Sequence, residues 1–226
     1  MTFPGAITTI RAHPTNTLGP PNNPKGFCVH TPEEPADDYP ATPYWFSLPH
    51  PDRAGSTTWF ISTKGTVYEC VPEDVAAIAN GVIGKPYPAW ADPNVSLNRQ
   101  TVSVEVEGYA ATIGTTLTAA QRASLVALIR YAAAKYGFPI DRAHIFGHYE
   151  VANNRSDPGT LPIDAIITET QEDDMTPEQD AILRDIQDWV KTDIPDRLTA
   201  LETAVAALQT GAAGYSVLAE LGLKKA

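Results

Sequence analysis

The sequence predicts an α/β domain in which a mixed central β-sheet is flanked by helices. Three observations support this prediction. Short runs of β-branched and aromatic residues recur between residues 26 and 146, with turn residues between them. A long segment with apolar residues at helical spacing lies between two of these runs. The resulting order of strand, hairpin, strand, helix and strand describes a mixed sheet with helices packed on it.

The first part of the predicted domain leads from an extended arm into a buried strand. The arm is rich in proline and has one strand-like run at residues 6–10. Residues 26–29 are predicted to form a buried strand that carries His30 at its end. Residues 32–51 are predicted to form a long proline-rich loop, and loops of this length are usually functional. We expect its aromatic residues 44–46 either to line a binding groove or to pack in the interior.

The sequence pattern in the middle of the chain predicts a hairpin, a strand, a helix and a last strand. Runs at residues 57–61 and 66–71 flank a turn that contains glycine, which is typical of a hairpin. Residues 101–106 alternate valines with polar residues, so one face of this strand is apolar. Residues 117–136 begin at a capping box and end at a glycine, which predicts a helix. Residues 143–146 then form the last strand.

The character of the chain changes after residue 167. We expect one domain at residues 1–167, an acidic linker at residues 168–176 and a C-terminal helical segment at residues 177–226. The last segment starts with a capping box and continues with apolar residues at alternating spacings of four and three, as in a short coiled coil. Pro195 lies where the spacing shifts and predicts a kink. Because so short a stripe is unstable alone, we expect it to pack on the domain or to form a homo-oligomer.

Composition and charge exclude several classes of partner. The formal net charge is −11, and residues 166–226 carry 12 acidic against 5 basic residues. An acidic protein with an acidic tail is a poor ligand for nucleic acid or an anionic membrane surface. No apolar run is long enough to span a bilayer, and the N-terminus lacks a secretory-signal pattern, so no membrane insertion is expected. Cys28 and Cys70 are expected to be buried thiols, with a disulfide between them as the alternative.

One stretch near residue 150 concentrates groups that bind metals. His148 follows an apolar run and a glycine, and Asp157 lies nine positions later in a turn with Pro158 and Gly159. Imidazole nitrogen and carboxylate oxygen are ligands that zinc accepts, and a catalytic zinc needs three protein ligands and one open position. The third ligand must come from elsewhere in the chain, and His30 is the best candidate. We therefore expect His30, His148 and Asp157 to bind Zn²⁺.

Four sequence blocks follow one another in the order of a known family. They are Val29-His30-Thr31, Ser103-Val104-Glu105-Val106-Glu107-Gly108, Gly147-His148-Tyr149-Glu150-Val151-Ala152 and Arg155-Ser156-Asp157-Pro158-Gly159. In this order they resemble the zinc-dependent N-acetylmuramoyl-L-alanine amidases of type 2, which share a fold with peptidoglycan-recognition proteins. The resemblance implies that fold, a bound Zn²⁺ and hydrolysis of the amide between N-acetylmuramic acid and L-alanine in bacterial peptidoglycan.

The resemblance also implies roles for single residues. Glu105 matches the catalytic glutamate of the family, a carboxylate that takes a proton from the attacking water and hands it on. Glu107 is expected to be structural. Arg155 matches a basic residue that stabilises the oxyanion, and arginine keeps its charge at any working pH. A tyrosine of the family is replaced by Thr57 and Thr58, whose hydroxyls can orient water but leave more of the proton transfer to Glu105.

Four other histidine, glutamate and tryptophan residues have simpler interpretations. Glu150 is expected to hold the local geometry around the metal ligands. His144 has no matching motif and is expected to be structural. His50 in the long loop is expected to be structural too, with a substrate contact as the alternative. Trp90 either lines the binding groove or packs in the interior.

Three interpretations of the biological role are open. A phage endolysin for host lysis is favoured, because it would stay in the host cytoplasm until a separate pore releases it to the cell wall. A cytosolic recycling amidase also needs no signal peptide, but the appended acidic helices are not expected there. A non-catalytic peptidoglycan-recognition module is the third, but such relatives typically lack a zinc ligand, and all three ligands are present here.

Overall fold

A computed structural model describes residues 2–81, 84–172, 198–199, 202–203 and 205 of the chain. The chain divides into two units, Met1–Asp173 and Asp174–Ala226. In the second unit the described residues are helical. The predicted capping box, the kink at Pro195 and most of the predicted coiled-coil stripe lie outside the described residues, and self-association through this segment stays a prediction.

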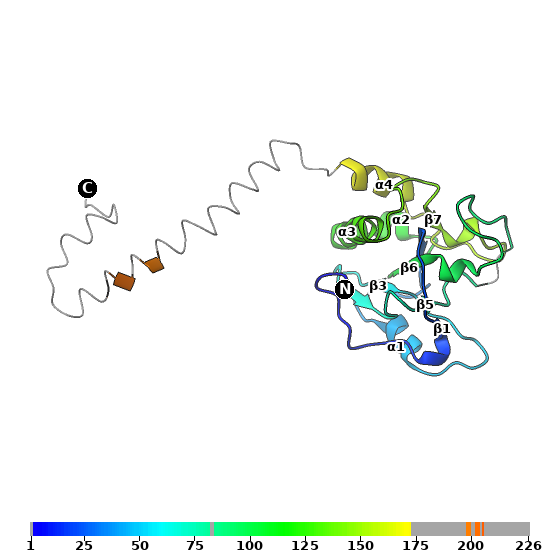
Figure 1. The fold of residues 1–226 in the computed structure, drawn as a ribbon, viewed down its shortest axis with the longest axis horizontal. Coiled ribbons are helices and arrows are strands. Elements are labelled where there is room, and N and C mark those ends of the chain that lie inside the picture. The colour runs from blue at the N-terminus through cyan, green and yellow to red at the C-terminus, as the bar shows by residue number, and fades with distance from the viewer. Residues whose placement is uncertain (1, 82–83, 173–197, 200–201, 204, 206–226) are drawn as a thin grey trace. The chain divides into compact units, whose positions relative to one another are not determined.

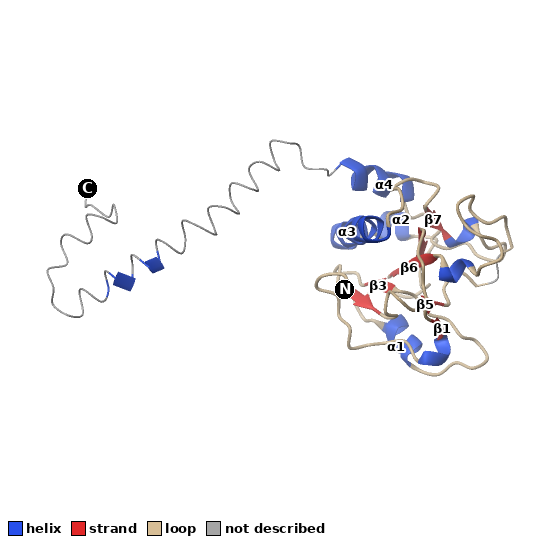
Figure 2. Cartoon of the chain, in the orientation of Figure 1, coloured by secondary structure: helices blue, strands red, loops and turns tan. Residues whose placement is uncertain are grey.

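A five-stranded mixed sheet forms the centre of the first unit, in the strand order β4-β3-β6-β2-β7. Figures 1 and 2 label three of its strands, β3, β6 and β7. Strand β2 (Gly26–His30) lies between β6 (Thr101–Val106) and β7 (Ile145–Gly147) and runs parallel to both. Strand β3 (Trp59–Ile61) pairs with β6 in parallel, and β4 (Val67–Glu69) closes the edge in antiparallel direction. The predicted mixed sheet is confirmed.

The remaining elements are short, apart from two helices described below. Strand β1 (Thr17–Gly19) pairs with β5 (Ala76–Ala77) in a separate two-stranded sheet. The short helices are η1 (Pro14–Asn16), α1 (Ala41–Ser47), η2 (Leu97–Arg99), α2 (Ile113–Thr116) and η3 (His148–Glu150).

Helices α3 (Ala119–Tyr136) and α4 (Ile163–Glu172) pack together against one face of the sheet (Figure 1). The predicted capping box of α3 is present: Thr118 Oγ1 accepts a hydrogen bond from Gln121 N, and Gln121 Oε1 accepts one from Thr118 N, both at 3.1 Å. The helix ends at Gly137, whose φ of 75° is a left-handed conformation that glycine adopts without strain.

Alternation along the strands separates a covered face of the sheet from an open face. Phe27 and Val29 of β2 and Val104 of β6 enter the main core with α3 and α4. Side chains at the intervening positions point to the other face, because successive residues of a strand alternate. His30 and Glu105 follow this alternation and line a cavity on the face that α3 and α4 leave open.

One prediction made for the proline-rich segments is wrong. Residues 32–51 are not a loop throughout, because α1 lies within them. Pro43 is tolerated there because it lies in the first turn of the helix, where a backbone N–H has no helical partner. The strand-like run at residues 6–10 forms an isolated bridge from Ile7 to Tyr68, as expected for an extended arm that lies on the domain.

The predicted linker at residues 168–176 is also wrong at its start. Helix α4 continues to Glu172, and Ile163, Ile166, Ile167 and Thr170 are buried at helical spacing. This apolar stripe packs on α3 and holds the segment against the domain.

Both cysteines are buried free thiols, as expected, and the alternative of a disulfide is wrong. Cys28 and Cys70 belong to separate clusters on the open face of the sheet. No helix in the described part of the chain has the length and apolarity that a bilayer span requires.

Candidate functional site

Three neighbouring strands bring the candidate site together where they end. His30 is the last residue of β2 and pairs in register with Glu105 of β6. Val29 pairs with Gly147, the last residue of β7, so His148 follows at the same edge of the sheet. The carboxyl ends of parallel strands are the usual location of binding sites in α/β sheets. The sheet therefore unites residues from three distant parts of the sequence.

The loop after β7 fixes His148 and positions Asp157. The backbone N–H of Tyr149 donates a hydrogen bond to the carbonyl of Asp157 at 2.9 Å. Glu150 Oε1 accepts a hydrogen bond from Gly147 N at 2.6 Å and one from Arg142 Nη2 at 2.8 Å. Glu150 thus holds the turn on which His148 lies, as predicted.

The three predicted metal ligands meet in one buried cluster. His30 Nδ1 lies 3.1 Å from His148 Nδ1, and each of these nitrogens lies 3.1 Å from Asp157 Oδ2. The three atoms form a nearly equilateral triangle. Among the residues that the structure describes, this is the one group of histidine, cysteine and carboxylate side chains with the spacing of a metal site.

The donor set of this triangle fits a zinc ion. Tetrahedral zinc with ligand bonds of about 2.1 Å separates its ligand atoms by about 3.4 Å, close to the observed spacing. His148 Nε2 lies 3.1 Å from the carbonyl oxygen of Asn80, an acceptor, so the proton of the ring belongs on Nε2. This leaves His148 Nδ1 with a free lone pair that points at the cluster. A carbonyl oxygen that fixes the tautomer in this way is typical of metal-binding histidines.

The electrostatics of the cluster favour the metal-binding states of His30 and Asp157. Burial lowers the pKa of His30, although the hydrogen bond with Asp157 opposes this effect. Burial alone would raise the pKa of Asp157, but its close contacts with the rings of His148 and His30 outweigh burial and hold that pKa well below its usual range. Neutral imidazole and ionised carboxylate are the forms that coordinate zinc.

Glu105 presents its carboxyl group to the same cavity as the cluster. Its Oε2 atom is shielded from solvent and has no hydrogen-bond partner among the described residues. Burial raises the pKa of Glu105 well above its usual range, and the charges of Asp157 and Glu34 raise it further, while Arg155 lowers it. A cation at the triangle would offset the repulsion from Asp157.

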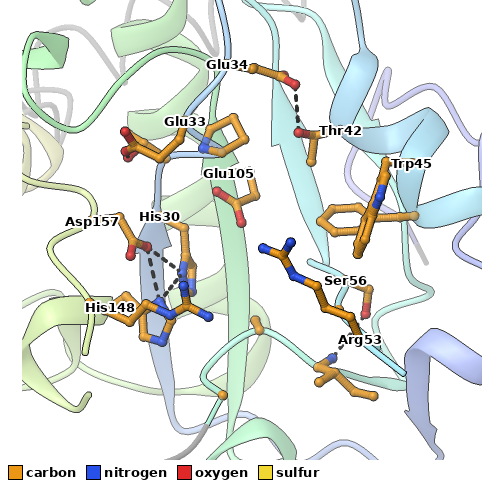
Figure 3. Close-up of a pocket in the computed structure, with 18 of the residues that line it drawn as sticks. His30, Glu33, Glu34, Thr42, Trp45, Arg53, Ser56, Glu105, His148 and Asp157 are labelled. Atoms are coloured by element: carbon orange, nitrogen blue, oxygen red, sulfur yellow. Dashed lines mark hydrogen bonds and ion pairs between the residues drawn. The ribbon is translucent and has the colours of Figure 1, made fainter. Parts of the chain in front are cut away.

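The cavity around these groups has a volume of about 600 Å³. Figure 3 shows Asp157, His30 and His148 on one side, Glu105 in the centre, and Arg53 and Trp45 on the opposite side. Such a volume admits a small-molecule segment of a larger substrate. Its lining residues are His30–Glu34, Ala41, Thr42, Trp45, Phe46, Arg53–Ser56, Ile78, Ala79, Gly81, Glu105, His148, Arg155 and Asp157.

Arg155 and Glu107 differ in their exposure and in their contacts. Arg155 is exposed at the cavity and makes no hydrogen bond or ion pair with another described residue, so its charge is available to a ligand. Glu107 is fully buried and accepts hydrogen bonds from the backbone N–H groups of Asp37, Asp38 and Thr63. Glu107 therefore ties the loop before α1 to the β3–β4 hairpin, which is a structural role.

The expectation that Thr57 or Thr58 orients water is wrong. Both side chains are fully buried and neither lines the cavity. Thr57 Oγ1 donates to Ser103 Oγ at 3.0 Å, and Ser103 N donates to Thr58 Oγ1 at 3.2 Å. These hydroxyls join the start of β3 to β6, so neither threonine can take the role of the tyrosine that the family has at this position.

The other aromatic and histidine residues separate into two groups. Trp90 stacks on His144 with ring centroids 5.8 Å apart, and neither residue lines the cavity, so both are structural. Trp45 and Phe46 do line it, while His50 stacks on Trp45 outside the lining. The predicted aromatic groove is thus formed by residues 45–46, without Trp90.

Three cavity features were missed by reasoning from the sequence. Arg53 and Glu34 line the cavity, and burial raises the pKa of Glu34 to about 7 although a hydrogen bond from Thr42 opposes the rise. The carbonyl of Asn80 fixes the His148 tautomer, and a backbone carbonyl has no signature in sequence. The acidic pair Glu33-Glu34 shortly after the His30 block was the available signal in the sequence.

Comparisons with known proteins identify a matching family and several similar folds. Residues 20–160 match the sequence model of the N-acetylmuramoyl-L-alanine amidase family. The fold is similar to PlyL at TM-score 0.55 and 17% identity, covering 73% of this chain and 96% of that chain. A mutant endolysin from Bacillus subtilis gives TM-score 0.53 at 19% identity, with 73% and 97% covered.

A further similar structure is a selenomethionine derivative of AmpD, at TM-score 0.51 and 19% identity, covering 75% of this chain and 97% of that chain. At such identities the three structures show a common fold. A comparison with curated protein sequences finds no match.

Proposed function

The chain belongs to the N-acetylmuramoyl-L-alanine amidase family, and from this premise we propose that it is a zinc-dependent peptidoglycan hydrolase. The bond cleaved would be the amide between the lactyl group of N-acetylmuramic acid and L-alanine of the stem peptide. The observation that carries the proposal is the 3.1 Å triangle of His30, His148 and Asp157 beside an unpartnered Glu105 carboxyl oxygen.

The triangle supplies three protein ligands and leaves the side toward the cavity open. His30 Nδ1, His148 Nδ1 and Asp157 Oδ2 would hold the zinc. When bound there, zinc would supply a Lewis acid that polarises the scissile carbonyl and would lower the pKa of a water toward about 7. The burial of both imidazoles keeps competing water away from the ligand atoms.

Glu105 is suited to move the protons of the reaction. Its carboxylate would accept a proton from the attacking water and pass it to the nitrogen of the leaving alanine. A raised pKa favours a group that must both accept and release a proton near neutral pH. Because no tyrosine or threonine hydroxyl faces the cavity at the start of β3, this work falls to Glu105.

Arg155 is suited to stabilise the negative charge that develops on the scissile carbonyl oxygen. It lies at the rim of the cavity two positions before Asp157, and its guanidinium stays charged at any working pH. A fixed positive charge beside the reacting carbonyl lowers the energy of the transition state more than that of the bound substrate.

We further propose that the enzyme is a phage lysin that acts on the host cell wall after release through a separate pore. The similarity in fold to a mutant endolysin supports this setting. A recycling amidase is the second candidate, supported by the similar fold of AmpD. A recognition module without catalysis is disfavoured, because the three ligand positions and Glu105 are all occupied by functional side chains.

The test is digestion of purified peptidoglycan with the zinc-loaded protein. New N-terminal alanine amines and new reducing sugars are measured together, with and without a chelator. We expect alanine amines to rise without reducing ends, and chelator or Glu105→Gln to abolish the rise. Glu172→Gln, at an exposed position of α4, is the matched control and should keep full activity.

Two outcomes would contradict the proposal. Binding to peptidoglycan without release of either product would make the protein a recognition module. Release of reducing ends alone would identify a glycosidase. Comparing intact sacculi with soluble muropeptides as substrates separates the lysin setting from the recycling setting.

A further inference from the structure

The cavity has a second wall whose chemistry differs from that of the metal cluster. Helix α1 forms this wall, and Trp45 and Phe46 are its aromatic members. In Figure 3 Trp45 lies across the cavity from His30 and Asp157, with Glu105 between them. The side opposite the metal ligands therefore carries an aromatic wall, with the guanidinium of Arg53 beside it.

The aromatic wall is held rigidly before any ligand binds. Phe46 is buried and packs with Phe60 and Cys70 on the open face of the sheet. Asn16, which is fully buried, donates hydrogen bonds from Nδ2 to the carbonyls of Phe46 and Leu48, both at 2.8 Å. A wall fixed in this way loses little conformational entropy when a ligand packs on it.

Trp45 differs from Phe46 because its ring stays partly open. The side chain is 36% exposed and lines the cavity. The imidazole of His50 stacks parallel to the indole, with ring centroids 3.8 Å apart and an interplanar angle of 12°. A ring nitrogen of His50 also lies 2.8 Å from the carbonyl of Trp45. One face of the indole is therefore covered and held, and an exposed aromatic surface beside a cavity marks a binding surface.

The substrate of the proposed reaction has two chemically different sides. A sugar ring lies on the acyl side of the scissile amide, and a peptide with carboxylates lies on the amine side. The C–H face of a sugar ring is apolar and flat enough to stack on an indole. We propose that Trp45 is the platform for the sugar ring on the N-acetylmuramoyl side, and that it makes the enzyme specific for a glycosylated substrate. This inference rests on the proposed amidase function.

Two small substrates with the same scissile amide test the inference. One is N-acetylmuramoyl-L-alanyl-D-isoglutamine, and the other is D-lactoyl-L-alanyl-D-isoglutamine, which lacks the sugar ring. We expect the wild-type enzyme to prefer the first in kcat/KM. Trp45→Ala should reduce kcat/KM for the first about tenfold and leave the second unchanged. Trp45→Phe should retain most of the preference, because it keeps an aromatic face.

The matched control is Tyr44→Ala on the same helix. Tyr44 is an exposed aromatic residue that stacks on Tyr39 and does not line the cavity. This variant should leave kcat/KM for both substrates unchanged. Thermal unfolding of each variant shows whether α1 remains folded. Where the lactoyl compound is cleaved too slowly to measure, its inhibition of peptidoglycan digestion, compared with that by the muramoyl compound, gives the same preference.

Three other results would overturn this inference, and the third would also overturn the proposed function. Equal loss on both substrates in Trp45→Ala overturns the inference, because the wall then supports the fold or binds the peptide. Equal kcat/KM of the two substrates for the wild type also overturns it, but leaves the amidase function intact. Failure to release alanine amines from either compound and from peptidoglycan overturns the proposed function, and this inference falls with it.

Discussion

The two faces of the central sheet use the same strands for different purposes. On β6, Val102, Val104 and Val106 enter an apolar core beneath α3 and α4. The alternate residues Ser103 and Glu105 point to the open face, where polar side chains are buried with specific hydrogen bonds or face the cavity. The covered face is an ordinary core, and the open face carries the chemistry.

This difference shows how the apolar face stabilises a fold whose other face buries polar groups at a cost in free energy. Burying carboxyl and imidazole groups costs free energy unless each group is paired. The covered face buries large apolar side chains, including Trp59, Leu128 and Ile129, and this burial stabilises the sheet. Residues on the two faces should therefore respond to substitution in opposite ways.

The largest effect is expected from Glu105→Gln on the open face. Without the carboxylate that moves protons, kcat should fall about 10²- to 10⁴-fold. Stability should not fall, because the substitution removes an ionisable group that has an unpartnered buried oxygen. Rates of alanine-amine release and thermal unfolding measure the two quantities. A loss of both would show that the faces are not separable at this position.

The converse effect is expected from Leu128→Ala on α3. Leu128 is fully buried in the covered core, so its truncation should lower the free energy of unfolding by about 2–5 kcal/mol. The kcat per folded molecule should stay unchanged. Urea unfolding gives the stability. The control is Leu48→Ala, at a side chain that is 57% exposed, which should cost less than about 0.5 kcal/mol.

Zinc should stabilise the protein through the open face alone. With free zinc at about 100 times its dissociation constant, the gain is about 2.7 kcal/mol. The melting temperature measured in zinc and in chelator reports this gain. His148→Ala should abolish the response, whereas Leu128→Ala should lower both melting temperatures and keep their difference. An equal zinc response in His148→Ala would place the ion elsewhere.

The stability of the metal-free protein should fall as the pH falls. The folded-state pKa values of His30 and Asp157 both lie below their ordinary values, so the unfolded chain binds protons more readily. Their contribution is complete at neutral pH. It decreases below about pH 6.5 as histidine titrates in the unfolded chain, and further below about pH 4 for aspartate. Urea unfolding between pH 8 and pH 4 measures this, and His30→Gln should flatten the upper part of the profile.

The smallest effect is expected at the start of α3. Thr118→Ala removes the side-chain half of the capping box and should cost about 1 kcal/mol. Activity should not change, because α3 lies on the covered face. Thr118→Ser keeps the hydroxyl and is the control. A loss of activity in the alanine variant at temperatures where it stays folded would show that the two faces are coupled through α3.

Much of the fold was predictable because its signals are local. The capping box and terminal glycine of α3 lie within one segment, and so does the alternation of β6. Helix α4 was missed because acidic residues on its exposed side obscured the buried stripe from Ile163 to Thr170. Helix α1 was missed because its surroundings are rich in proline, although Pro43 is compatible with a first turn.

The candidate ligands were predictable as residue types at strand ends, but their meeting was not. Nothing in the sequence near His30 specifies that β2 lies between β6 and β7, because strand order depends on contacts between distant segments. The same holds for Asn80, whose carbonyl selects the His148 tautomer. The buried hydrogen bonds of Thr57 and Thr58 also follow from pairing with β6.

The sequence by itself determined the alternation of each strand, the ends of α3 and the residues able to bind zinc, because these depend on neighbours within a few positions. Only the tertiary structure decided which face of the sheet α3 and α4 cover, and therefore that His30 and Glu105 face a cavity. It also decided that an aromatic wall stands opposite the metal ligands. The physical reason is that burial and strand order minimise the free energy of the whole domain, and no single segment contains that information.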